Sequence, residues 1–291
     1  MKNLQIKIKS LFILFLTLLA IGSPFLIARQ VSAASASTAE ASLDLLPVSA
    51  SLSAGLLHSA MINYDRRLYI WGDNTYGQLG LGVDDYYDSP QWLEMRDDVA
   101  AVSLGGYHSL VLLADGSVWS FGRNAYGQLG IGSTDIQNVP VQVEGLPSIL
   151  AISAGFMHSM ALGADGSVWV WGNNTEKQVG DVADEIISGN NGNVLGRRRL
   201  TPAIVVFSGA VSIAAGGQHS MYLNKQGQVF AWGDNRKGQL GDGTSQSHAS
   251  PLIVPGLENV TEIAAGFQHS LAVVRSSEND ILMAWGDDSR I

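Results

Sequence analysis

Residues 154–180 read AGFMHSMALGADGSVWVWGNNTEKQVG and contain three landmarks that recur along the chain. The first is Ala-Gly-x-x-His-Ser, the second is Trp-Gly, and the third is a turn ending in Gly-Gln-Leu-Gly or a variant of it. Copies of the first landmark lie 50, 50, 61 and 50 residues apart, and their histidines are His58, His108, His158, His219 and His269. Landmarks that stay in phase over five copies identify an internal repeat, which is typical of solenoids and propellers.

The residues before each Trp-Gly pair alternate in size with a period of two. In the third copy Trp169 and Trp171 flank Val170, so one face of the expected strand is bulky and the other is shallow. The bulky face of one unit can fill the shallow face of the next, which predicts sheets stacked around an axis. The aromatic residues at this position in the five units are Trp71, Phe121, Trp171, Trp232 and Trp285.

Each unit has room for about four short strands. We expect one strand before the Ala-Gly pair, one from His-Ser onward, one that ends at Trp-Gly, and one that follows a proline. Asp-Gly and Gln-Gly pairs mark turns between strands because these residues tolerate positive φ. The prolines expected to precede the fourth strands are Pro90, Pro140, Pro202 and Pro251.

The predicted fold is therefore an all-β propeller of about five blades over residues 43–291. The units lie near residues 43–94, 95–144, 145–206, 207–255 and 256–291, so there are four full repeats and a partial fifth. Two arrangements stay open. A strand at Leu43 to Leu46 could pair with the unfinished last unit and close a five-bladed ring; otherwise the blades form an incomplete open arc, as in a truncated chain.

The first residues differ in composition from the rest of the chain. A basic start at Lys2, Lys7 and Lys9, an apolar run over residues 11–21 and a small-x-small ending at residues 31–33 predict a signal peptide over residues 1–33. A flexible Ala/Ser-rich segment follows at residues 34–42. We therefore expect a secreted, extracellular or cell-surface protein, which contacts a membrane only through the signal segment if that segment stays uncleaved.

The charge of the chain argues against one class of partner. Its 291 residues include 17 Lys and Arg against 26 Asp and Glu, a formal net charge of −9. Such a chain repels phosphates, so nucleic acid is not an expected partner. It has no Cys, which excludes a disulfide framework and Cys-ligated zinc, so packing must stabilise the fold.

Taken together, the patterns Ala-Gly-x-x-His-Ser, Asp-Gly-x-Val-x-x-Trp-Gly and Asn-x-x-Gly-Gln-Leu-Gly resemble the repeat of the regulator of chromosome condensation (RCC1) family. The resemblance covers Leu52 to Ile291, and the chain looks like a bacterial secreted member of that family. It implies a β-propeller, which has seven blades in the family, whereas fewer repeats are encoded here. It also implies nucleotide exchange on a small GTPase and chromatin binding, but the export signal and the acidic charge argue against both.

Each repeated histidine precedes a serine, a residue pair that can supply a base and a nucleophile in catalysis. Neighbours on a strand point to opposite faces, and five equivalent copies suit a scaffold better than a single active site. We therefore predict that the repeated histidines and aromatic residues are structural, and that each imidazole bonds a backbone group of its own or an adjacent blade. The sequence predicts no catalytic residue, no metal site and no cofactor.

Binding residues are expected where the copies differ. Exposed Tyr and Trp favour contact with protein or carbohydrate, and a loop of the first unit carries Tyr86, Tyr87 and Trp92. The third unit carries an insertion before its proline, with a basic loop formed by Arg197, Arg198 and Arg199. Variable positions of the first landmark are expected to line one face of the propeller at Tyr107, Phe156 and Phe267.

These features favour a secreted, non-enzymatic repeat protein that binds an extracellular protein or a cell-wall polymer through a loop-lined propeller face. One alternative is an inert fragment of a longer seven-bladed protein. The other is an activity of the chain itself, either GTPase regulation or hydrolysis of a wall polymer, although the sequence offers no unrepeated carboxylate pair for hydrolysis.

Overall fold

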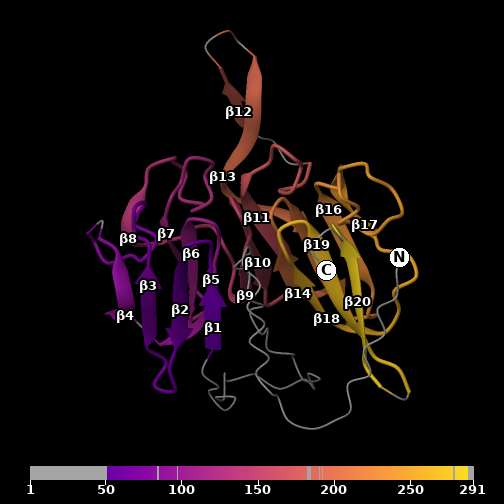
Figure 1. The fold of residues 1–291 in the computed structure, drawn as a ribbon, viewed down its shortest axis with the longest axis horizontal. Coiled ribbons are helices and arrows are strands. Elements are labelled where there is room, and N and C mark those ends of the chain that lie inside the picture. Colours follow the sequence, from indigo (N-terminus) through magenta and orange to yellow (C-terminus); the bar gives the residue numbers. More distant parts are fainter. Residues whose placement is uncertain are drawn as a thin grey trace.

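The computed structural model describes residues 51–287, apart from positions 84, 97, 182–184, 190, 192 and 278. The described residues form strands and no helix, so none of them belongs to a helix that could cross a membrane. Five antiparallel sheets stand side by side in an arc as the blades of a propeller (Figure 1). The predicted signal peptide, the Ala/Ser-rich segment and the possible strand at Leu43 to Leu46 lie outside the described residues.

The strands of each blade follow the order of the chain, except in blade 3. Blade 1 contains β1 (Ser51–Ala54), β2 (His58–Ile62), β3 (Leu68–Gly72) and β4 (Tyr87–Leu93). Blade 2 contains β5 (Val99–Leu104), β6 (His108–Leu113), β7 (Val118–Gly122) and β8 (Gln137–Gln142). Blade 3 contains β9 (Ile149–Ala154), β10 (His158–Gly163), β11 (Val168–Asn173), β12 (Glu185–Ser188) and β13 (Val194–Val206). Blade 4 contains β14 (Ala210–Ala215), β15 (His219–Asn224), β16 (Val229–Gly233) and β17 (His248–Ile253), and blade 5 contains β18 (Val260–Ala265), β19 (His269–Val274) and β20 (Ile281–Gly286).

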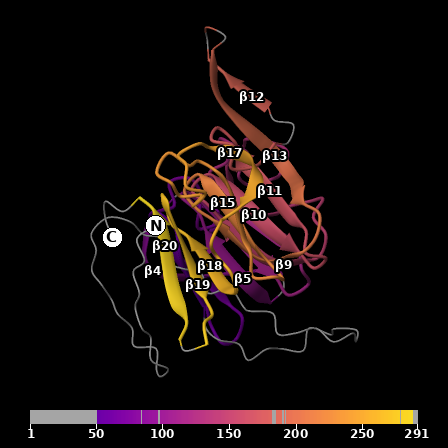
Figure 2. The same ribbon diagram turned by 90° about the vertical axis from the view of Figure 1, so that its right-hand side faces the viewer.

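The first strand of each blade lies on the inside of the arc. Strand β1 contacts β5, β5 contacts β9, β9 contacts β14, and β14 contacts β18. In blade 3 His158 pairs with Gly172, so the Ala-Gly loops and the ends of the third strands share one end of the propeller. We call this end the upper face. The hairpin of β12 and β13 projects from it (Figures 1 and 2).

The fourth strands begin before their prolines, not after them as predicted. Pro90, Pro140 and Pro251 lie inside β4, β8 and β17, each of which is an outer edge strand of its blade. Pro202 lies in β13 beyond the residues that pair with β12. An edge strand tolerates proline because the missing N–H would face outward, where no ladder hydrogen bond is made.

The bulky face of each blade packs on the shallow face of the blade before it, as the alternation in size predicts. Phe121 shares a buried cluster with Leu68 and Ile70 of blade 1, and Trp232 shares one with Val170 of blade 3. Two further clusters join blades 2 and 3 and blades 4 and 5. Full burial of one such ring stabilises the fold by about 3 kcal/mol, so these interfaces hold the arc together.

A second set of contacts joins the same blades through hydrogen bonds. Each imidazole Nε2 lies 2.9–3.1 Å from the serine Oγ of the next blade, in the pairs His58–Ser109, His108–Ser159, His158–Ser220 and His219–Ser270. Each serine in turn donates to a glutamine carbonyl of the blade that holds the histidine, at 2.7–2.8 Å. A hydroxyl has one proton to donate, so the imidazole is the donor to the serine. The partner is a serine side chain and not the backbone group that we predicted.

Burial keeps these imidazoles neutral. Desolvation lowers the pKa of His58 and His219 to about 4, and the pKa of His108 and His158 to about 3. An imidazole that already donates its Nε2 proton to a hydroxyl cannot accept a proton from it at that nitrogen. The repeated His–Ser pairs therefore hold neighbouring blades together by hydrogen bonds.

The two ends of the arc have no partner blade among the described residues. Trp71 of blade 1 is partly exposed, whereas its equivalents Phe121, Trp171 and Trp232 are fully buried. His269 of blade 5 is only partly buried, and no described residue forms a hydrogen bond with its imidazole. No buried cluster within the described ranges joins blade 5 to blade 1. The described residues therefore form an open five-bladed arc (Figure 1).

Candidate functional site

The loops of the upper face alternate between large and small residues at the position after Ala-Gly. The five residues there are Leu56, Gly106, Phe156, Gly217 and Phe267. A Cβ on Gly106 would lie 2.7 Å from the ring of Phe156, and a Cβ on Gly217 would lie 2.3 Å from the carbonyl oxygen of Phe267. Each glycine thus makes room for the aromatic residue of the next blade.

The space that the glycines leave is filled by a row of four rings, which we call the aromatic ladder. Its members are Tyr76 and Tyr107 with centroids 5.4 Å apart, Phe156 at 6.0 Å from Tyr107, and Phe267 at 5.4 Å from Phe156. All three contacts are edge-to-face, the geometry that aromatic quadrupoles favour. The ladder crosses from blade 1 to blade 5, so it links loops that are far apart in sequence.

Arg123 adds a charge to the ladder. Its guanidinium lies 5.0 Å from the ring centre of Tyr76 and 5.6 Å from that of Tyr107, within range of cation–π attraction. Phe267 at the other end of the ladder is 39% exposed. The upper face therefore presents an apolar strip with a cation at one end, a surface suited to contact with another macromolecule.

The structure brings together the three predicted residues Tyr107, Phe156 and Phe267. Sequence reasoning missed Tyr76, because its copy at Tyr126 made it look like part of the repeated turn. It also missed Arg123, although a signal was present: the other four copies carry Asp or Asn at this position.

The most prominent feature of the upper face is the β12–β13 hairpin, which has no counterpart among the described residues of the other blades. It extends well beyond the blades (Figures 1 and 2) and carries exposed aliphatic residues. Their exposed fractions are 55% for Ile186, 58% for Val194 and 61% for Leu195. Strand β12 is also the free edge of its sheet. Ile186 lies on this edge strand, and Val194 and Leu195 lie beside it in β13. Exposed aliphatic side chains at a free sheet edge are a typical pairing surface for another chain.

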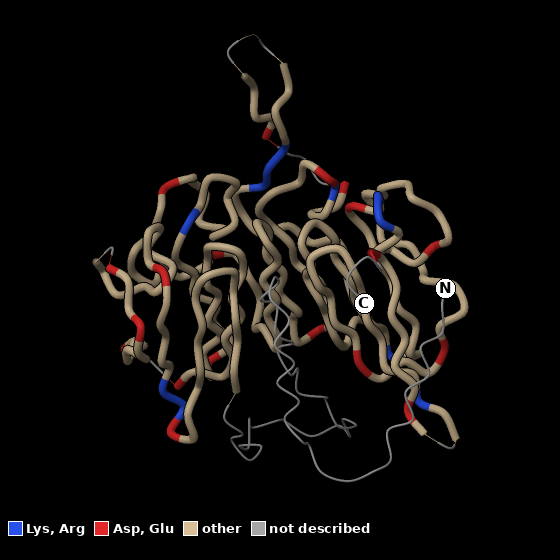
Figure 3. The backbone as a smooth tube through the Cα atoms, viewed as in Figure 1, with Lys and Arg blue, Asp and Glu red and all other residues tan. Residues whose placement is uncertain are grey.

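The predicted basic loop is part of a strand. Arg197, Arg198 and Arg199 lie in β13, where the strand leaves the blade (Figure 3). Arg198 binds Glu185 of β12 at 3.2 Å and the carbonyl of Ala125 in blade 2, also at 3.2 Å. The sequence analysis interpreted the insertion as a loop, but its two halves pair with each other. Arg198 thus anchors the hairpin to the neighbouring blade, and Arg197 is exposed.

The predicted aromatic loop of blade 1 is split between the two ends of the propeller. Tyr87 pairs with Gly72 at the upper end of β4, whereas Trp92 pairs with Tyr69 near the lower end. Trp92 stacks with Arg67, whose guanidinium lies 5.3 Å from the ring centre. The prediction that Tyr86, Tyr87 and Trp92 form one loop was wrong, because the strand between them is extended. Only Tyr86 precedes β4 in the loop itself, and it is 71% exposed.

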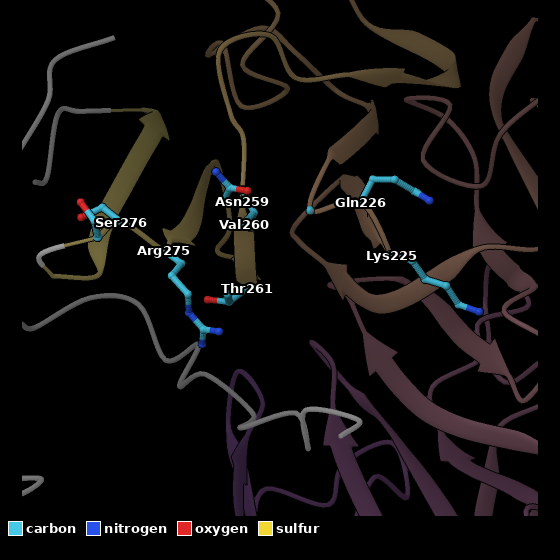
Figure 4. Close-up of a pocket in the computed structure, with 9 residues that line it drawn as sticks. Lys225, Gln226, Asn259, Val260, Thr261, Arg275 and Ser276 are labelled. Carbon is cyan, nitrogen blue, oxygen red and sulfur yellow. The ribbon is translucent and has the colours of Figure 1, made fainter. Parts of the chain in front are cut away.

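A pocket of about 550 Å³ lies at the opposite end of the propeller, between blades 4 and 5. It is lined by nine residues, among them Lys225, Asn259, Thr261 and Arg275. Figure 4 shows that the side chain of Lys225 points away from the pocket residues of blade 5, and that the ends of the Lys225 and Arg275 side chains lie well apart. The two cations do not converge on a common point, so this pocket does not arrange its charged groups to bind one anion. Across the described ranges, no group of three or more His, Cys, Asp or Glu residues could hold a metal ion.

Comparison with known sequences gives a consistent family. The model of the regulator of chromosome condensation (RCC1) repeat matches residues 65–112, 115–162, 165–223 and 226–273. Human RCC1 domain-containing protein 1 is 38% identical over 79 residues, which are 26% of this chain and 20% of the relative. Human E3 ubiquitin-protein ligase HERC2 is 44% identical over 64 residues, which are 21% of this chain and 1% of the relative.

Comparison with solved structures identifies the same fold. Human WBSCR16 superposes with a TM-score of 0.70 at 30% identity, over 82% of this chain and 62% of that protein. Prp20p of Saccharomyces cerevisiae superposes with a TM-score of 0.67 at 23% identity, over 78% of this chain and 56% of that protein. The matched part is less than two thirds of each of these four relatives. The repeat model accounts for four successive segments across most of the chain, and the chain therefore belongs to the regulator of chromosome condensation (RCC1) repeat family.

Proposed function

We propose that this chain is a secreted, non-enzymatic protein that binds another protein through the upper face of its propeller. The observation that carries the proposal is the β12–β13 hairpin, which exposes Ile186, Val194 and Leu195 beyond the blades. Aliphatic side chains on a projecting ribbon lose contact with water only when another molecule covers them, and their burial would favour association.

The base of the hairpin supports this role because it is fixed to the propeller. The backbone N–H of Asn174 donates to the carbonyl of Arg197 at 2.8 Å, and the side chain of Arg198 reaches blade 2. A ribbon that is anchored at its base loses less conformational entropy on binding than a free loop does. The aromatic ladder lies on the same face and supplies rings of the kind that dominate binding energy at interfaces.

One further observation supports binding rather than catalysis, and another supports export of the chain from the cell. The His–Ser pairs are repeated, and their imidazoles are neutral donors to the serines. The sequence pattern of residues 1–33 is that of an export signal. Protein partners are known for one relative with this fold, Prp20p, which has binding properties to Gsp1p and histones.

Mass spectrometry of the exported chain should find Ala34 at the mature N-terminus; retention of residue 1 would contradict secretion by cleavage.

The binding proposal is tested with a partner captured from culture medium by the immobilised chain and then purified. A hairpin variant carries serine in place of three exposed aliphatic residues, Ile186, Val194 and Leu195. A matched control carries serine in place of three exposed aliphatic residues remote from the upper face, Leu150, Leu252 and Ile253. If each hairpin contact contributes about 1 kcal/mol, the hairpin variant should bind about 100-fold more weakly, with no change for the control.

Two results would contradict the proposal. One is equal affinity of the hairpin variant and the unchanged chain for the purified partner. The other is co-sedimentation of both with purified cell-wall polymer to the same extent, which would place recognition on a polymer and away from the hairpin.

A further inference from the structure

Strand β12 is the open edge of the five-stranded sheet of blade 3, whose order is β12-β13-β11-β10-β9. It lies on the projecting hairpin, clear of the blades (Figure 2). Natural proteins commonly keep such an edge from pairing by placing Lys, Pro or other charged residues on it. The four residues of β12 read EIIS, and their one charge, Glu185, is paired with Arg198 at 3.2 Å. This edge therefore lacks the usual protection against pairing with another strand.

The backbone of Ile186 points to the open side of β12. Ile186 lies opposite Arg197 in the ladder between β12 and β13. The carbonyl of Arg197 accepts a hydrogen bond from the N–H of Asn174 at 2.8 Å, and its N–H donates to Thr175 Oγ1 at 3.4 Å. Both bonds lie on the side of β13 away from β12, so Ile186 and Arg197 form a non-hydrogen-bonded pair. In such a pair each residue directs its N–H and C=O away from the other, so those of Ile186 point outward.

The backbone of Ser188 points the same way. The N–H of Gly189 donates to the carbonyl of Asn193 at 2.8 Å, so these two residues form a hydrogen-bonded pair. Ser188 pairs with Val194 one position earlier, and the two kinds of pair alternate along an antiparallel ladder. Ile186 and Ser188 thus present two donors and two acceptors along one edge. Their spacing of two residues is the spacing at which an added strand forms its hydrogen bonds.

The side chains beside this edge indicate the chemistry of the added strand. Ile186 is 55% exposed, and Arg197 lies on the same face of the hairpin because the two residues are directly opposite each other. Arg197 is exposed and forms no ion pair with a described residue. An incoming strand would therefore meet an apolar side chain and a cation. A second copy of β12 would bring only Glu185, which is already bound to Arg198, so it would offer no carboxylate for Arg197.

We propose that β12 binds an extended segment of a protein partner, which joins the sheet as an additional strand beside β12. The segment pairs its backbone with Ile186 and Ser188, places an apolar residue beside Ile186, and carries a carboxylate that meets Arg197. Backbone pairing supplies the affinity, and the side chains supply the selectivity. This inference rests on the proposed function, because it specifies how the hairpin holds its partner.

The test uses a synthetic peptide of about eight residues, in which Val alternates with Thr and one Val is replaced by Glu. Hydrogen exchange of the backbone amides of the full chain is measured by NMR. Saturation with the peptide should slow exchange at Ile186 and Ser188 about ten-fold, because each amide gains a hydrogen bond. A second peptide, N-methylated at two consecutive central amides, lacks a donor on each of its edges and should give no protection.

Variants of the chain locate the contact. Ser188→Pro removes an outward N–H, which an edge strand tolerates, and should lower the affinity for the peptide about ten-fold. Ser188→Ala keeps the N–H and is the matched control, with unchanged affinity. Arg197→Gln should bind the peptide with Glu about three-fold more weakly and should bind a peptide with Gln in its place as the unchanged chain does. Unchanged affinity of Arg197→Gln for the peptide with Glu would refute the role of the carboxylate.

Three results would overturn strand addition: binding without slower exchange at Ile186 and Ser188, equal affinity of Ser188→Pro and Ser188→Ala, or no binding of the peptide at about 1 mM. Exchange that slows as the concentration of the chain rises, without peptide, would overturn it in favour of a second copy. If circular dichroism shows that Ser188→Pro has unfolded, the N-methylated peptide decides, because affinity equal to that of the parent peptide refutes backbone pairing. The proposed function fails separately, when the serine variant of the hairpin keeps its affinity for the captured partner.

Discussion

Acid should unfold this protein through its buried histidines. Four imidazoles are fully buried with pKa values lowered from 6.5 to about 3 or 4, and desolvation is the largest cause for each. In the unfolded chain the same groups titrate near pH 6.5. Between pH 6.5 and 4 the unfolded state therefore binds more protons than the folded state, and stability falls as the pH falls.

The size of the effect follows from the pKa difference. At pH 5, which is about 1.5 units below the unfolded pKa, each histidine lowers the free energy of unfolding by about 2 kcal/mol. Four equivalent groups together remove about 8 kcal/mol, which is comparable to the whole stability of a typical domain. The loss should be complete near the folded pKa values, because below them both states are protonated.

Urea unfolding followed by far-UV circular dichroism, at steps between pH 7.5 and 4.5, measures this loss. The slope of unfolding free energy against pH should approach the uptake of four protons near pH 5, about 5 kcal/mol per pH unit. His108→Gln keeps an N–H donor for Ser159 and removes one titrating group, so its slope should correspond to three protons. A stability that stays constant between pH 7 and 5, or an uptake of fewer than two protons, would refute the assignment of buried neutral imidazoles.

Three further changes test the packing between blades by urea unfolding at pH 7.5. Ser159→Ala should lower the free energy of unfolding by about 2 kcal/mol, because it leaves the buried N–H of His108 without an acceptor; no loss would mean that this bond is not formed. Trp171→Ala should cost about 4 kcal/mol by opening a cavity, whereas the half-exposed Trp92→Ala should cost less than about 1 kcal/mol, and equal costs would contradict the assigned interface. Gly217→Ala should cost about 2 kcal/mol, because its Cβ would lie 2.3 Å from a carbonyl oxygen; a neutral effect would show that the loop can move aside.

Much of the fold could be predicted from the sequence because each repeat unit carries the same local pattern of residues. The period of two around Trp171 identifies a strand, and its recurrence at Trp232 identifies another blade. The nesting of bulky and shallow faces also follows from this alternation, because side chains two residues apart share a face. The limits of the fourth strands were less predictable, since proline at an edge strand does not end it.

Only part of the candidate site could be predicted from the sequence, because its residues come from different blades. Tyr107, Phe156 and Phe267 stood out as variable positions of one landmark, but their contacts cross from blade to blade. Trp92 and Tyr86 are near each other in sequence, yet an extended strand carries them to opposite ends of the propeller. Closeness in sequence therefore did not indicate closeness in space at this site.

The amino-acid sequence by itself determined the all-β repeat of about five units and the aromatic residues that fill the interfaces between blades, because these depend on patterns within about fifty residues. The tertiary structure alone decided that each imidazole bonds the serine of the next blade, that four rings form one ladder, and that an insertion pairs with itself as a projecting hairpin. These contacts depend on how one sheet is rotated and placed against the next. That placement is set by the packing of whole faces, and no single segment of the chain encodes it.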